Sequence, residues 1–263
     1  MAEPQNFLDL AWALTTLLEI VLLCYLLRRK LYSPHPAFFI YVLTVILQSL
    51  VQRSASWYWG PQSLKYWTIA WSTQAVVICA RWVAVVEIAR KVMERYAGIW
   101  RMVGRILVAV SILVLVYSIA VSQRQWTLVV LNADRTLELC IGTFIVCMFL
   151  FARYYRIPIH HLERLIAVGF CLYSCAWVIN DSIYENWRGS FWNLWDYINI
   201  FAFFGSLLLW IAAAKKHSES PKVATQTSLP PELYGELSEE LNSRLLLLNN
   251  RLNQLLRSED FRP

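Results

Sequence analysis

Seven long apolar segments constrain the fold of this chain more than any other feature of its sequence. Each approaches twenty residues, the length that an α-helix needs to cross the hydrocarbon core of a bilayer. They lie near residues 7–27, 36–52, 66–89, 103–121, 132–152, 165–185 and 193–213. Backbone groups in lipid must find hydrogen-bond partners within the protein, so such segments fold as helices. The sequence therefore predicts an all-α membrane protein in which residues 1–214 form a bundle of seven transmembrane helices.

The amino-acid composition supports the membrane class and argues against a nucleic-acid-binding protein. Only 16% of the 263 residues are charged, whereas a soluble domain of this size carries about 25%. The net charge of +6 could suggest a nucleic-acid partner. The basic residues instead lie at the ends of the apolar segments, where they flank a membrane. The predicted partner is the lipid bilayer, with no nucleic acid.

The distribution of basic residues also predicts the orientation in a cell membrane. Thirteen lysine and arginine residues flank the segment ends on one side, and five flank those on the other. The richer side is expected to be cytoplasmic. The N-terminus carries no basic residue and no cleavage signal before its apolar run, so the first segment is expected to be a retained helix. We therefore expect a multi-pass protein with its N-terminus outside and its C-terminus in the cytoplasm.

The composition changes after the seventh segment. Residues 215–229 are polar and are predicted to form a linker, and residues 230–263 are predicted to form a cytoplasmic helix. Prolines at the start, acidic residues early and basic residues late are the pattern that a helix favours. Leucines recur at the alternating spacing of a short coiled coil, at positions 241, 245, 248, 252 and 255. This helix could dimerise, bind a cytoplasmic partner through residues 230–257, or dock under the bundle.

Arg81 is the most unusual residue of the predicted membrane region, because it lies near the middle of the third segment. A charge at that depth is costly and normally faces a partner or a wet cavity. Glu19 lies at the same predicted depth on the first segment, so we expect it to be the ion-pair partner of Arg81. One interpretation of such a pair is a structural latch between helices that takes no part in ligand binding. Glu87 is expected to pair locally with Arg90 and Lys91.

Polar and aromatic residues share helical faces in the outer halves of several segments. If these faces converge, they would line an outward-facing cavity with acidic and aromatic walls, which suits a small organic cation. The alternative is that they form an interfacial belt whose carboxylates reach water. The candidate ligand-binding residues are Glu19, Trp71, Gln74, Arg81, Glu138, Trp177, Asp181, Asp196 and Asn199.

Several functional classes are disfavoured by what the predicted spans lack. No histidine falls within any of them, which argues against haem ligation by two histidines and against a metal-dependent intramembrane hydrolase. No catalytic motif, metal site or cofactor site is predicted, and an enzyme is not expected. The leading hypothesis is a receptor-like or sensory protein with an interaction helix at its C-terminus. The alternatives are a structural or accessory subunit and a small-solute carrier.

Overall fold

The computed structural model describes most of the chain. The described residues are 3–60, 62–93, 96–122, 126–155, 157, 159–186, 192–216, 243–251 and 254. Of residues 3–9, 97–98, 181–186 and 192–196, only the backbone is described.

Seven long helices account for nearly all of the described residues, and no strand occurs among them. They are α1 (Glu3–Arg28), α2 (Pro36–Trp59), α3 (Leu64–Val92), α4 (Ala97–Val121), α5 (Trp126–Tyr154), α6 (His161–Asn186) and α7 (Trp192–Lys216). All seven are long and apolar enough to cross a membrane. This confirms the predicted all-helical architecture, and each predicted span lies within one helix. The helices continue past the spans because apolar length marks only the part that lies in hydrocarbon.

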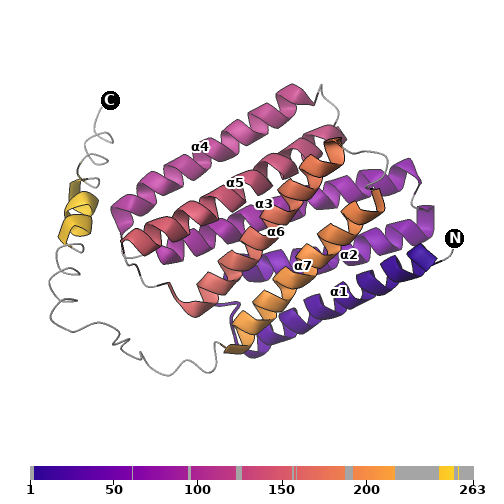
Figure 1. Cartoon of the computed structure of the whole chain (residues 1–263), viewed down its shortest axis with the longest axis horizontal. Helices are drawn as coiled ribbons and strands as arrows, with labels where there is room; N and C mark the ends of the chain where they lie inside the picture. The colour runs from indigo at the N-terminus through magenta and orange to yellow at the C-terminus, as the bar shows by residue number, and fades with distance from the viewer. Residues whose placement is uncertain are drawn as a thin grey trace.

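The helices alternate in direction and form one bundle (Figure 1). The most extensive helix pairs are α6 with α7 and α2 with α3. By contrast, α4 lies at the edge of the bundle and packs mainly against α5. One hydrogen bond also joins α3 to α4, because Trp82 Nε1 donates to Ser111 Oγ at 2.9 Å. The outward face of α4 is apolar and exposed, with Leu113 68% and Val108 60% accessible, as expected of a helix that faces lipid.

Most of the buried apolar side chains lie in one half of the bundle, which we call the packed half. It contains the C-terminal ends of α1, α3, α5 and α7 and the N-terminal ends of α2, α4 and α6. Its centre is an aromatic cluster of Phe38, Tyr41, Phe170 and Trp210, with ring centroids 5.0–6.4 Å apart. Aromatic pairs at these distances stabilise a core beyond the area that they bury.

A glycine on α6 allows Trp210 to enter this cluster. A side chain at Gly169 would overlap the indole ring of Trp210. The close approach also lets Trp210 Nε1 donate to the carbonyl oxygen of Ile166 at 3.1 Å. Next to it, Ser206 Oγ donates to the Gly169 carbonyl oxygen at 2.8 Å. The contact between α6 and α7 therefore depends on the absence of a Cβ atom at position 169.

At the end of the packed half, Glu87 of α3 binds the N-terminus of α2. The backbone N–H groups of Ala37 and Phe38 donate to its two carboxylate oxygens at 3.2 and 3.1 Å. First-turn N–H groups have no partner within their own helix and carry partial positive charge, so a carboxylate stabilises them. The expected local pairing of Glu87 with Arg90 and Lys91 is therefore wrong, because both oxygens bind α2.

The C-terminal tail is described only in part. Residues 215 and 216 of the predicted linker continue α7, and residues 217–229 lie outside the described residues. Within the predicted cytoplasmic helix, residues 243–251 are helical, and they are drawn in yellow in Figure 1. Leu245 is 1% exposed and belongs to the buried cluster of the bundle, whereas Leu248 of the same predicted seam is 47% exposed. This burial favours docking on the bundle over a coiled-coil seam.

Candidate functional site

The half of the bundle opposite the packed half encloses a cavity with a volume of about 600 Å³. This half contains the N-terminal ends of α1, α3, α5 and α7. Six helices contribute to the wall of this central cavity, namely α1, α2, α3, α5, α6 and α7. Ligand pockets for small molecules typically have volumes of about 300–1,000 Å³. The central cavity is therefore large enough for a small organic molecule.

Aromatic side chains form much of the cavity wall. Trp67 and Trp71 stack along α3 with ring centroids 6.5 Å apart, and Tyr173 and Trp177 stack along α6 at 6.0 Å. Each pair is spaced four residues apart, which puts both rings on one face of the helix. Phe203 of α7 meets the Tyr173 ring edge-on at 5.7 Å. The arrangement presents ring faces on two sides of the cavity.

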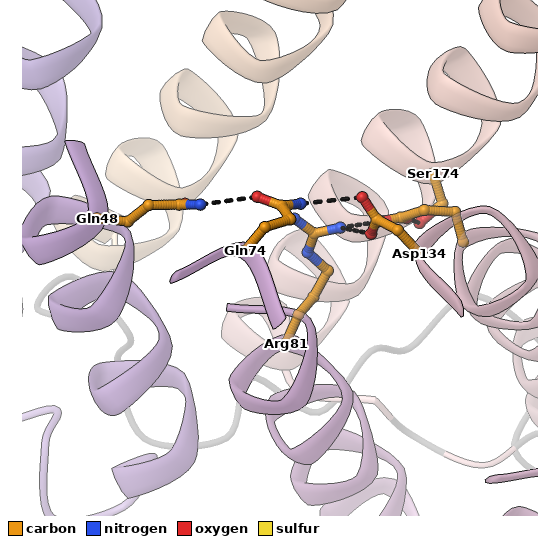
Figure 2. A network of polar contacts seen from close by, with 6 residues as sticks. Gln48, Gln74, Arg81, Asp134 and Ser174 are labelled. Carbon is orange, nitrogen blue, oxygen red and sulfur yellow. Dashed lines mark hydrogen bonds and ion pairs between the residues drawn. The ribbon is translucent and has the colours of Figure 1, made fainter. Parts of the chain in front are cut away.

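A chain of polar side chains connects neighbouring helices of the bundle, as Figure 2 shows. Gln48 Nε2 of α2 donates to Gln74 Oε1 of α3 at 2.7 Å. Gln74 Nε2 in turn donates to Asp134 Oδ2 of α5 at 2.9 Å. These two hydrogen bonds link α2, α3 and α5 and help to fix the three helices relative to one another.

Arg81 lies at the centre of this chain and pairs with two carboxylates of α5. Its Nη1 is 3.6 Å from Asp134 Oδ1, and the same nitrogen pairs with Glu138 Oε1. Ser174 Oγ of α6 donates to Glu138 Oε2 at 2.5 Å. The guanidinium also lies 4.7 Å from the centre of the Tyr173 ring. The two carboxylates and the Tyr173 ring compensate the cost of burying the charge of Arg81.

The expected ion pair between Arg81 and Glu19 is wrong. Equal depth fixes the height of a residue in the membrane but not the helix that its side chain faces. In the structure α1 packs against α2 and α7, whereas α3 packs against α2, α5 and α6. Arg81 therefore meets the carboxylates of α5, and Glu19 lies elsewhere on the cavity wall.

Glu19 is buried without a counter-ion among the described residues. It is 3% exposed, and its Oε2 has no hydrogen-bond partner. No described lysine or arginine lies within ion-pair distance of it. A buried carboxylate in this state is costly.

The structure brings together six of the nine candidate residues. The central cavity is lined by Glu19, Trp71, Gln74, Arg81, Trp177 and Asn199. Glu138 instead lies behind Arg81 and borders a separate, mostly apolar pocket of about 340 Å³ between α5 and α6. The side chains of Asp181 and Asp196 lie outside the described residues.

Other cavity residues were not among the candidates. Asp134 lies one helical turn before Glu138, so the sequence spacing already indicated that the two acids share a helical face. The sequence also indicated Gln48, because it is a polar residue within a predicted span. Tyr41 and Ser49 carry no sequence signal that separates them from ordinary helix-packing residues.

Among the described residues, no group of three histidine, cysteine, aspartate or glutamate side chains is arranged to hold a metal ion. The fold and the site together define a class, a seven-helix bundle of membrane-spanning type with a polar and aromatic cavity in one half. Comparisons with protein-family models, curated proteins and solved structures gave no match. The functional argument therefore rests on the geometry of the cavity.

Proposed function

We propose that this chain is a receptor-like integral membrane protein that binds a small organic cation in the central cavity. The observation that carries the proposal is the state of Glu19. This carboxylate is 3% exposed, lies on the cavity wall and has one oxygen without a hydrogen-bond partner. A cationic ligand would supply the missing charge and the missing donor in one step.

The aromatic lining supports the same ligand class. Seven of the residues that line the cavity are aromatic, and they are Tyr41, Tyr66, Trp67, Trp71, Tyr173, Trp177 and Phe203. Ring faces attract organic cations by about 0.5–2 kcal/mol per contact, and more strongly where water is excluded. A neutral or anionic ligand of the same size would gain nothing from Glu19 and less from these rings.

A receptor-like role is favoured over a carrier by the packed half. Below the cavity, Tyr41 belongs to both the cavity wall and the aromatic cluster with Phe38, Phe170 and Trp210. The cavity therefore ends on a close-packed core, and no continuous path crosses the part of the bundle that the structure describes. The distribution of basic residues supports an external position for the cavity and a cytoplasmic position for the tail.

The proposal can be tested by ligand-dependent thermal stabilisation of the purified protein in detergent. Tetramethylammonium, tyramine and tryptamine should raise the Tm, while neutral analogues of equal size should not, because a ligand stabilises the state that binds it. Glu19→Gln should remove the stabilisation. Glu163→Gln is the matched control, since it also removes a carboxylate but at the other end of the bundle, where Glu163 pairs with His35.

Equal stabilisation by the neutral analogues, or full retention of binding in Glu19→Gln, would contradict the proposed cation site. Uptake of the bound cation into proteoliposomes would instead identify the protein as a carrier.

A further inference from the structure

We infer that the ligand is an extended dication, a diamine or short polyamine, whose ends bind Glu19 and Asp134. This inference rests on the proposed cation site and specifies the chemical class of its ligand.

The first argument is the balance of charge around the cavity. Three buried carboxylates belong to the site, those of Glu19, Asp134 and Glu138, and they are 3%, 3% and 1% exposed. The described residues place one guanidinium among them, that of Arg81. With all groups ionised the site carries an excess of two negative charges. Two ligand charges would neutralise it, whereas a monoamine would leave one carboxylate uncompensated at a cost.

The second argument identifies the two carboxylates that need a cation. Arg81 is shared by Glu138 and Asp134, so its single positive charge leaves one carboxylate charge of this pair uncompensated. Of these two acids, only Asp134 lines the central cavity. Gln74 binds Oδ2 of Asp134 and so fixes the direction in which Oδ1 points. Asp134 and Glu19 are therefore the two incompletely compensated acids on the cavity wall.

The third argument is the separation of these two acids. Glu19 belongs to α1, which packs against α2 and α7, and Asp134 belongs to α5, which packs against α3, α4 and α6. In Figure 1, α1 and α5 lie on opposite sides of the bundle. Even helices in direct contact have axes about 8–10 Å apart. A ligand whose two cationic groups are separated by a chain therefore suits two acids on opposite walls of one cavity.

The cavity offers complementary groups at one end and along this path. An ammonium group has three donors. Near α1, Glu19 Oε2 and Asn199 Oδ1 of the adjacent α7 are acceptors without a hydrogen-bond partner. Trp71 and Tyr173 also line the cavity, so its wall offers aromatic surface to a methylene chain.

The test compares amines of matched length on the full-length protein in lipid nanodiscs by calorimetry. Putrescine and cadaverine should bind at least about tenfold more tightly than n-butylamine and n-pentylamine, a factor worth about 1.4 kcal/mol. Asp134→Asn should reduce diamine affinity to that of the monoamine. Glu19→Gln should weaken both, and Glu163→Gln should affect neither.

Equal affinity of the native protein for diamines and monoamines would overturn the dication and would leave the proposed cation site intact. This comparison needs no variant, so it decides the question even if Asp134→Asn disturbs the Arg81 network. If diamines bind more tightly but Asp134→Asn retains that advantage in a folded protein, Asp134 is not the second anchor. Absence of binding by every organic cation tested would overturn both the inference and the proposed function.

Discussion

At the scale of single residues, the structure assigns different roles to acids that look alike in the sequence. Glu87 binds the N-terminus of α2, Glu138 neutralises Arg81, and Glu19 faces the cavity without a counter-ion among the described residues. All three lie within helices long enough to span a membrane. What separates them is the partner that each acid meets. Which partner an acid meets depends on which helices pack together. Helix packing therefore decides whether an acid is structural or free to bind a ligand.

The pairing of Arg81 predicts the outcome of a double-mutant cycle. Arg81→Met leaves Glu138 without its buried counter-ion, so the variant should lose about 3–5 kcal/mol of stability. Arg81→Met combined with Glu138→Leu should recover much of that loss, because packed apolar groups can replace a buried pair. Thermal unfolding in detergent measures the coupling. The cycle of Arg81 with Glu19 serves as the control and should show coupling near zero. Strong coupling there would contradict the described pairing.

At the scale of helices, the packed half and the cavity half use different devices to join neighbours. In the packed half, α6 and α7 approach closely because Gly169 makes room for Trp210. In the cavity half, side-chain hydrogen bonds and ion pairs join α2, α3, α5 and α6 across greater separations. Polar contacts hold helices together where apolar packing is interrupted by an open volume.

Two glycine substitutions test this dependence on close packing. Gly169→Ala should destabilise the protein by about 1–3 kcal/mol, because an added methyl group overlaps Trp210 and overpacks the core. Gly104→Ala in α4 is the matched control, since nothing lies within 4 Å of its added Cβ. It should be neutral or stabilise by up to about 1 kcal/mol through helix propensity. The measurement is the free energy of unfolding of each variant. Equal effects of the two substitutions would refute the role assigned to Gly169.

At the scale of the whole molecule, the seven helices divide into a close-packed half and a half with a cavity. The packed half supplies most of the buried apolar contacts, while the cavity half has acids, amides and ring faces. The packed half can hold the cavity half in a fixed geometry, although burying polar groups in the cavity half is costly. Leu245 of the helical residues 243–251 belongs to the buried cluster of the packed half, which is the half remote from the cavity.

The expected orientation gives a prediction at this scale. A reporter fused after Lys216 should be cytoplasmic, and a reporter fused before Phe7 should be external, because the basic flanks concentrate on one side. Protease accessibility of the two fusions in sealed vesicles is the measurement. Finding both reporters on the same side of the membrane would contradict the prediction that the chain crosses it seven times.

The sequence predicts the helices and the burial of Arg81 well, because both follow from local properties. Apolar length locates each span, and counting residues along α3 places Arg81 in the interior, where it is 4% exposed. The partner of Arg81 could not be found in the same way. Its choice of Asp134 and Glu138 over Glu19 depends on the rotation and the neighbours of each helix. Tyr41, which forms both cavity wall and core, gave no local signal at all.

The position of α4 at the edge of the bundle follows from the direction of its neighbours. Helices α3 and α5 pack side by side and both begin at the cavity end, so they run parallel. A chain can join two parallel neighbours only by travelling back along the bundle, and α4 provides this return without lining the cavity. Six helices would suffice to build the cavity wall. The return helix makes the number of long helices odd, and this parity puts the start of α1 and the end of α7 at opposite ends of the bundle.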